Sequence, residues 1–431
     1  MIERKDSGIP WVGDIPQYWN TYKGKNILSI LERPVKQSDG IITCFRDGEV
    51  TLRANRREEG FTISDKEIGY QGIEPGDLVV HGMDGFAGSI GISDSRGKAT
   101  PVLNVMDSTE NKRFLMYYLR SMAYNGVFLA LSTGIRVRSC DTNWNKLKEI
   151  QFALPNLAEQ QAIADFLDRK CADIDSVLDK TKASIEEYQK LKQSVITHAV
   201  TKGLRGDRPM KNSGIEWIGQ IPEEWSVVRF KTLVSFRKGL NITKENLIES
   251  GIPVISYGQI HSKTNTGTCL DNTLYRFISE TYLETDSSCL VKKNDFLFAD
   301  TSEDYEGCGN CVYVDNNTTL FAGYHTIIAA SKNNDDKKYI AYQLLTDGWR
   351  SQVRSRVWGI KVFSVSRGHL SNAYTILPPA DEQKEIVSYL DQKCAEINIL
   401  IASKEKFIAE LELYKKSLIY EYATGKRLIS E

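Results

Sequence analysis

Two long stretches of the sequence carry apolar side chains at alternating steps of four and three residues. This spacing places those side chains along one face of an α-helix and approaches the seam of a coiled coil. A helix of this length with one apolar face needs a partner to cover it, and each stretch offers that face to the other. We therefore predict two long helices that pair through Leu167, Ile174, Leu178 and Ile185 in the first and Leu390, Ile397, Ile401 and Ile408 in the second.

The two helical stretches are copies of one another. LPNLAEQQAIADFLDRKCADIDSVL begins at Leu154, and LPPADEQKEIVSYLDQKCAEINILI begins at Leu377. Aligned without a gap, they keep a constant offset of 223 residues, and Thr201 still meets Thr424 at the far end. We expect the helices to run antiparallel, because each follows its own globular segment and the two segments would then lie at opposite ends.

A second repeat opens each half of the chain. SGIPWVGDIPQYW covers 7–19 and SGIEWIGQIPEEW covers 213–225, each with two tryptophans and an Ile-Pro pair. Because tryptophan buries a large area, we expect each motif to close over the core of its own globule. The repeats divide the 431 residues, more than one core usually holds, into a globule 1–153, a helix 154–206, a globule 207–376 and a helix 377–431.

Inside each globule, a further pair of segments predicts a sheet. Residues 76–93 and 294–314 each have the pattern of a strand, a glycine-bearing turn and a second strand. We therefore predict an α+β fold, in which two α/β globules with twisted, mostly antiparallel sheets are separated by two long helices that form an antiparallel coiled coil. The whole chain then has a pseudo-two-fold internal repeat.

The composition excludes several classes of protein. A hydrophobic share of 41% with 26% charged residues is that of an ordinary globular chain. No run of about 18 apolar residues exists, so we expect no membrane span. The first residues lack the apolar core of a signal peptide, and the eight cysteines show no pairing pattern. These features favour the reducing cytoplasm.

Catalytic and metal-binding motifs are missing from the sequence. No nucleotide-binding loop of the G-x-x-x-x-G-K-[ST] type exists, and Cys308 and Cys311 have no second ligand pair for zinc. Asp168 and Asp391, each two residues before a lysine, are similar to fragments of a nuclease motif, but we expect them to be surface charges on the polar side of the helices. We therefore predict no catalytic residue, no metal and no cofactor.

Two different globules, each opened by an SGIxWxGxIPxxW motif and closed by an LPxxxEQ helix, resemble the specificity subunit of type I DNA restriction-modification systems. The resemblance covers nearly the full chain and implies a subunit without catalytic activity. In that family each globule reads one half of a split, asymmetric site in double-stranded DNA. The helices set the spacing and dock two modification subunits, which carry the adenine methyltransferase activity, while a restriction subunit supplies nuclease and motor activity.

Candidate DNA contacts are basic and polar side chains near the predicted turns. Arginine suits guanine, and asparagine or glutamine suits adenine. Asn55, and Gln352 on an expected helix 339–356, are therefore candidate readers of a base, each with arginines nearby. A Gly-Ile-basic-Val motif occurs in both globules, and Tyr257 and His261 alternate along an expected strand. The full set is Arg53, Asn55, Arg56, Arg57, Arg136 and Arg138 in the first globule, and Tyr257, His261, Gln352, Arg354, Arg356 and Lys361 in the second.

The charge balance leaves two interpretations open. Residues 1–153 hold 20 basic and 19 acidic side chains, and residues 207–376 hold 19 of each. A protein that binds DNA alone usually shows a basic excess. Either partner subunits supply much of the contact with the phosphates, or the chain is a coiled-coil scaffold whose globules bind protein or carbohydrate. An enzyme in its own right is a third and weaker alternative.

Overall fold

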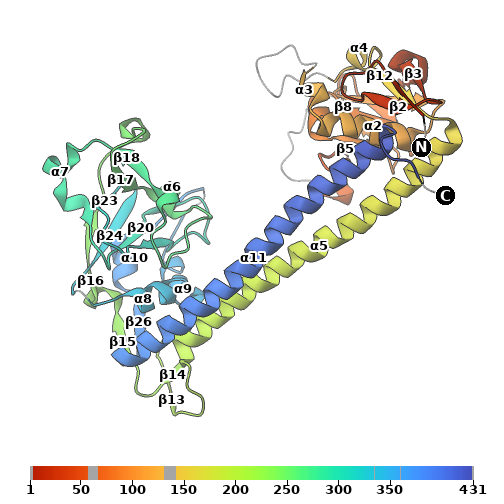
Figure 1. Ribbon diagram of the computed structural model, residues 1–431. Helices are drawn as coiled ribbons and strands as arrows, with labels where there is room; N and C mark the ends of the chain where they lie inside the picture. The colour runs from red at the N-terminus through yellow and green to blue at the C-terminus, as the bar shows by residue number, and fades with distance from the viewer. Residues whose placement is uncertain (1–2, 57–66, 131–141, 334, 360, 430–431) are drawn as a thin grey trace. The chain divides into compact units, whose positions relative to one another are not determined.

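The computed structural model describes residues 3–56, 67–130, 142–333, 335–359 and 361–429 (Figure 1). Two compact units share the chain, the first formed by Met1–Ala183 with Lys404–Glu431 and the second by Ser184–Ser403. Each unit contains one globular domain, one part of helix α5 (Leu157–Lys202) and one part of helix α11 (Ala380–Ala423). In the described ranges, no helix is long and apolar enough to cross a membrane.

The domain of the first unit is built on a four-stranded antiparallel sheet in the order β4-β11-β8-β9. Its strands are β4 (Leu28–Ile30), β8 (Leu78–His81), β9 (Ile90–Ile92) and β11 (Leu103–Ser108). Helix α2 (Lys112–Tyr124) packs against this sheet, and its Phe114, Tyr118 and Leu119 are fully buried. The remaining elements are the pairs β5 (Ile42–Cys44) with β6 (Val50–Leu52) and β7 (Gln71–Ile73) with β10 (Gly97–Ala99), and the short helices α1 (Gly24–Ile27), α3 (Val127–Ala130) and α4 (Trp144–Leu147).

The domain of the second unit repeats this sheet. Strands β16 (Val234–Lys238), β20 (Phe296–Ala299), β22 (Cys311–Tyr313) and β24 (Thr326–Ser331) form an antiparallel sheet in the corresponding order β16-β24-β20-β22. A second sheet in the order β18-β17-β23-β19 is added here, and its β17–β23 pair is parallel. The other elements are β17 (Ile252–Ile255), β18 (Arg276–Ile278), β19 (Leu290–Val291), β21 (Thr301–Ser302), β23 (Leu320–Ala322), β25 (Phe363–Ser364), α6 (Tyr257–Ile260), α7 (Tyr282–Thr285), α8 (Lys338–Leu344), α9 (Asp347–Arg354) and α10 (Arg367–Ser371). The predicted mixed fold with mostly antiparallel pairing is confirmed.

In both domains, the strand that enters pairs with the strand that leaves. The pairs are β3 (Asn20–Lys23) with β12 (Gln151–Leu154), and β15 (Ser226–Arg229) with β26 (Tyr374–Leu377). Each opening motif supplies the turn and second strand of a hairpin whose first strand comes directly before it: β1 (Arg4–Asp6) with β2 (Asp14–Pro16) in one unit and β13 (Met210–Asn212) with β14 (Gln220–Pro222) in the other. Hydrogen bonds between the entering and leaving strands hold the two ends of the domain together, so the long helix that follows starts at a defined place.

In the first unit, the start of α5 lies along the end of α11 (Figure 1). The rings of Phe166 and Tyr422 lie tilted by 40° with centroids 4.5 Å apart, and Lys415 Nζ donates to Asp175 Oδ1 at 2.6 Å. Residue numbers rise along α5 as they fall along α11 through these contacts. The two helices are therefore antiparallel here, as predicted.

The second unit pairs the other ends of the same helices. Lys192 Nζ donates to Asn398 Oδ1 at 2.8 Å, and Arg205 pairs with Glu385 at 3.0 Å. The direction is again antiparallel. Of the predicted seam residues in the two units, Leu167, Ile174, Leu178, Leu390 and Ile397 are buried, and Ile185, Ile401 and Ile408 are half-buried.

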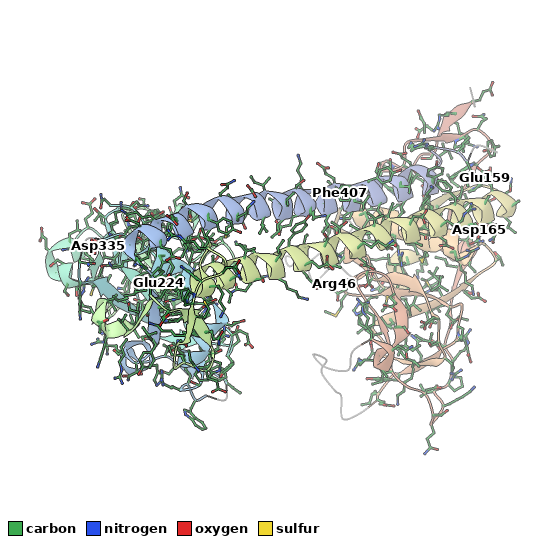
Figure 2. All side chains as sticks on the ribbon, turned by 90° about the horizontal axis from the view of Figure 1, so that it is seen from below. Arg46, Glu159, Asp165, Glu224, Asp335 and Phe407 are labelled. Carbon is green, nitrogen blue, oxygen red and sulfur yellow. The ribbon has the colours of Figure 1, made fainter. Side chains whose placement is uncertain are left out.

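A hydrogen bond between tryptophan and glutamate joins each opening motif to the start of a long helix. Trp19 Nε1 donates to Glu159 Oε1 at 3.3 Å, and Trp225 Nε1 donates to Glu382 Oε2 at 3.0 Å. Figure 2 labels Glu159 on α5. Both indole rings are fully buried, so neither N–H has water as an alternative partner. We call each of these contacts a clasp, and the two clasps occupy equivalent positions in the two repeats.

Asp168 and Asp391 form a second joint between domain and helix. Asp168 accepts a hydrogen bond from the Tyr117 hydroxyl at 2.7 Å, and Asp391 accepts one from the Tyr342 hydroxyl at 2.6 Å. Both carboxylates lie at the surface as expected, with side chains 37% and 41% exposed, and they also anchor α2 and α8 to the long helices. Burial raises the pKa of both tyrosines, which keeps the hydroxyls protonated as donors.

The burial of the second clasp predicts its contribution to stability. Glu382 is almost fully buried and also pairs with Arg208 at 2.7 Å. The substitution Trp225→Phe removes a hydrogen bond to this buried carboxylate. We expect it to lower the free energy of unfolding of the second unit by about 1.5–3 kcal/mol, as measured by urea denaturation followed by circular dichroism.

The matched substitution in the first unit is Trp19→Phe. Glu159 is half-buried and also accepts from the Tyr18 hydroxyl at 3.1 Å, so water and tyrosine compensate for the lost bond. The free energy of unfolding of the first unit should fall by less than that of the second. If the two substitutions lowered the free energy of unfolding equally, burial of the glutamate would not determine how much the hydrogen bond stabilises each unit.

Candidate nucleic-acid interface

Four loops of the second domain meet at one edge of its sheets. Three of them follow β17, β20 and β23, and the fourth leads into β25 and includes it. They comprise residues 256–261, 300–310, 323–325 and 357–364 without 360. The ring of Tyr257 lies 5.4 Å from that of His325, and Thr301 pairs with Ser364 between β21 and β25. We call these four loops the loop edge of the second domain.

Aromatic and polar side chains lie together at the centre of the loop edge. His325 Nδ1 is 3.1 Å from Asp300 Oδ1, and the Thr301 hydroxyl donates to the same carboxylate oxygen at 2.8 Å. The rings of Tyr257 and Tyr324 lie 5.4 and 6.1 Å from the imidazole. Loops that hold hydrogen-bonding groups at fixed positions on a rigid sheet are suited to contacts with DNA bases and phosphates.

The predicted strand around Tyr257 is wrong, because residues 257–260 form the short helix α6. Tyr257 is half-buried at the loop edge, and its DNA contact stays a prediction. His261 instead supports the loops from inside, since Nε2 contacts Thr301 O at 2.9 Å and Nδ1 contacts Asn310 Nδ2 at 3.1 Å. With both ring nitrogens engaged, His261 has no hydrogen-bonding group left for a base, and its predicted role is corrected.

Gln352 is buried and serves the fold. Its Oε1 accepts from Tyr374 N at 2.7 Å and its Nε2 donates to Tyr374 O at 3.1 Å, so the amide acts as a strand partner for β26. With 2% exposure the side chain cannot reach a base, and its prediction as an adenine reader is wrong. The expected helix 339–356 is also two helices, α8 and α9, because the Thr346 hydroxyl caps a new helix start by accepting from Trp349 N at 3.3 Å.

Arg354 holds the loop edge in place. Its side chain is only 12% exposed, donates to Glu306 O at 2.6 Å and pairs with Asp347 at 3.2 Å. Arg354 therefore supports the loop that contains Glu306 and is poorly placed to contact DNA. Arg356 and Lys361 are exposed, and their DNA contacts stay predictions.

In the first domain, the predicted side chains have partners within the domain. Arg53 Nε donates to Thr43 Oγ1 at 3.3 Å, Asn55 Nδ2 donates to Thr51 Oγ1 at 2.9 Å, and Arg56 pairs with Asp47 at 2.6 Å and with Glu49 at 2.9 Å. Asn55 and Arg56 are nevertheless exposed. Arg57, Arg136 and Arg138 lie outside the described residues.

Several arginines of the first domain are engaged in ion pairs within it. Arg96 pairs with Asp39 at 2.8 Å and also with Glu74, and its hydrogen bond lowers the pKa of Asp39 to about 2. Arg33 pairs with Asp77 in the same way. These arginines stabilise loops of their own domain, so they add little positive charge for binding phosphates.

The long helices expose apolar side chains at positions that the repeat relates. Val177 of α5 and Tyr414 of α11 are exposed in the first unit, and Leu191 of α5 and Leu400 of α11 are exposed in the second. The offset of 223 residues matches Val177 to Leu400 and Leu191 to Tyr414. Phe407, which Figure 2 labels, and Leu413 add to the first group, and Ile399 adds to the second. Each unit therefore exposes apolar side chains on both long helices, which we call its apolar helix surface, and the two sets contain equivalent positions.

Cys308 and Cys311 are buried free thiols. Burial raises the pKa of Cys308 to about 11 and that of Cys311 to about 12, so both stay protonated at neutral pH, whereas zinc binds thiolates. Among the described residues, no group of three or more His, Cys, Asp or Glu side chains is arranged to hold a metal ion.

Sequence reasoning missed His325, Tyr324 and Trp358. Trp358 lies directly before the Gly-Ile-Lys motif and is 89% exposed. Because tryptophan is more often buried, only its position beside this motif could have marked it as a candidate site residue. His325 has φ 54°, which lies in the left-handed region. No residue pattern marks that backbone conformation in advance, because histidine has no special tolerance comparable to that of glycine.

Comparisons with known proteins agree on one family. The sequence model of the family described as "Type I restriction modification DNA specificity domain" matches residues 69–187 and 222–412. The chain is 25% identical over 342 residues to the specificity subunit of the type I restriction enzyme MjaVIII of Methanocaldococcus jannaschii, covering 77% of this chain and 75% of that one. It is 26% identical over 374 residues to the EcoBI specificity subunit of Escherichia coli, covering 82% and 74%.

One solved structure shows the same fold over almost the whole chain. It comes from work on complex assembly and conformational transition of the type I R-M system. Its TM-score is 0.72 at 14% identity, over 96% of this chain and 99% of that chain.

Proposed function

This chain belongs to the family of type I restriction-modification DNA specificity domains, and from that membership we propose a subunit that reads DNA in two parts. The domains 1–153 and 207–376 each contact one half of a bipartite site in double-stranded DNA. The helices α5 and α11 keep the two contacts at a fixed spacing. The subunit itself is without catalytic activity, and methylation and cleavage belong to modification and restriction subunits that assemble on it.

The observation that carries this proposal is the repetition of one sheet with different loops. The order β4-β11-β8-β9 corresponds to β16-β24-β20-β22, so the same platform occurs twice. The loops that follow equivalent strands differ, with Met83 and Asp84 after β8 and Asp300 and Thr301 after β20. Because side chains that reach base edges determine sequence preference, two platforms with different loops read different sequences and the site is asymmetric.

The helix length bounds the span of the site. Helix α5 has 46 residues and is therefore about 69 Å long at 1.5 Å per residue. At about 3.4 Å per base pair, this length corresponds to roughly 20 base pairs of duplex. We take that value as the upper bound for the two halves together with the gap between them.

The matched apolar surfaces of the helices support the docking of two modification subunits. A partner present in two copies needs two equivalent surfaces, and Val177 with Tyr414 and Leu191 with Leu400 supply equivalent positions in the two units. An apolar helix face is a common docking site for a helix of another chain. The partners would also supply contacts with DNA phosphates, so the subunit alone should bind DNA weakly.

Mapping of methylated adenines tests the proposal. Co-expressed with its cognate modification subunit in a host that lacks other adenine methylation, the chain should direct methylation to one gapped motif with two different halves. Genome-wide sequencing that detects N6-methyladenine measures this motif. The modification subunit expressed alone is the control and should give no motif. A scaffold for protein or carbohydrate would leave the co-expression map empty, and methylation by the chain alone would identify an enzyme.

Lengthening both helices tests the spacing role. An insertion of seven residues after Ala183 in α5 and after Ser403 in α11 adds nearly two full turns to each helix, about 10 Å, and preserves the apolar seam. The gap in the methylated motif should widen by at most about three base pairs. Both half-sites should stay unchanged. A change in the recognised bases would contradict the idea that the helices act only as a spacer.

Charged substitutions on the apolar helix surfaces test docking. Leu400→Asp places a charge on the surface of the second unit, and Val177→Asp does so on that of the first. Each change should lower the number of bound modification subunits from two to one, as counted by native mass spectrometry, and the double change should leave none. The control Ser403→Asp adds the same charge at an exposed polar position of α11. Retention of two subunits by the double variant would place docking elsewhere.

A further inference from the structure

One histidine of the loop edge is exposed and yet held in a single orientation. His325 has φ 54°, a left-handed backbone conformation that residues other than glycine adopt rarely. Its side chain is 57% exposed, but Nδ1 lies 3.1 Å from Asp300 Oδ1 and the ring packs against Tyr257 and Tyr324. Strained residues of this kind persist where the surrounding structure fixes them, and they cluster at functional sites.

The carboxylate of Asp300 determines which imidazole nitrogen carries the proton. An ionised carboxylate only accepts hydrogen bonds, so Nδ1 of His325 donates to it. The Thr301 hydroxyl donates to the same oxygen at 2.8 Å and orients the carboxylate. In the neutral ring Nε2 is then a hydrogen-bond acceptor, and within the described part of the chain no residue donates to it.

The same geometry argues against catalysis and metal binding by this group. The Thr301 hydroxyl lies on the Nδ1 side of the ring, 3.4 Å away, and none of the contacts between described residues places a nucleophile at Nε2. One histidine and one carboxylate do not make up a metal-binding group, and the described residues contain no group of three. An outward-facing acceptor held by a carboxylate and two rings is suited to recognition.

We propose that His325, oriented by Asp300, is a specificity-determining residue of the second domain, whose Nε2 accepts a hydrogen bond from the exocyclic amino group of adenine or cytosine. These amino groups are the base donors that the major groove presents. The inference rests on the proposed function, because it assigns one base contact within a domain that reads DNA. It adds the class of base that this contact selects and the residue that selects it.

The test is the methylation map of the complex that carries His325→Gly. Glycine adopts φ 54° without strain, so the melting temperature should stay the same or rise. Discrimination at one position of the second half-site should fall roughly 5- to 150-fold, which is the range for the loss of one base contact. The gap and the first half-site should not change.

Two further variants sharpen the result. In Asp300→Asn the amide can donate to Nδ1, which permits the tautomer with the proton on Nε2. The preference at the same position should then move from adenine or cytosine toward the acceptor-bearing guanine or thymine. His198→Ala removes an exposed histidine from α5 in the same unit and should leave the motif unchanged.

The outcomes separate this inference from the proposed function. A wild-type motif in the map of His325→Gly would overturn the base contact and leave the two-part reader intact. Loss of methylation at all sites together with a lower melting temperature, seen also in His325→Asn, which tolerates the same backbone, would assign His325 a structural role instead. A wild-type complex that gives no gapped motif would overturn the proposed function and this inference with it.

Discussion

The hydrogen bond from a buried tryptophan to a glutamate at the start of a long helix is the contact that ties the opening motif to the helix in each half of the molecule. Trp19 with Glu159 and Trp225 with Glu382 join the first residues of a domain to the helix that follows it. The pairing of entering and leaving strands, β3 with β12 and β15 with β26, brings the two sides of the clasp together. A recognition domain that is held at both ends in this way cannot rotate freely on its helix. This restriction is needed for any fixed spacing between two DNA contacts.

Repetition made the architecture predictable from the sequence. Two copies of one helical pattern indicated that the long helices pair, because an apolar seam such as that through Leu167 and Leu390 has to be covered. Their antiparallel direction followed from the order of the chain, in which each helix comes after its own globule. Within the domains, the period of strand and turn was sufficient to predict antiparallel sheets. It was not sufficient to distinguish the short helix α6 from a strand, since a few residues of alternating polarity fit both.

The role of an individual polar side chain could not be predicted in the same way, because it depends on neighbours that are distant in sequence. Gln352 has the right amide for adenine, but it bonds to the backbone of Tyr374, 22 residues away. His261 has the right imidazole, but Thr301 and Asn310 occupy both nitrogens. His325, which no motif marked, is the exposed imidazole of the loop edge. Residue type indicated which chemical group could bind a base. Only the tertiary contacts showed which side chain of that type is still free to do so.

The equivalence of the two joints has a consequence for how such proteins diversify. Tyr117 with Asp168 and Tyr342 with Asp391 repeat the same attachment on both sides, and the clasps do likewise. A recognition domain is therefore a unit whose two attachment points are equivalent in both repeats. The repeated stretches that encode those attachment points offer homologous sites for genetic recombination. Under the proposed function, exchange of one domain would change one half-site and leave the helices, with any partner that docks on them, as they are.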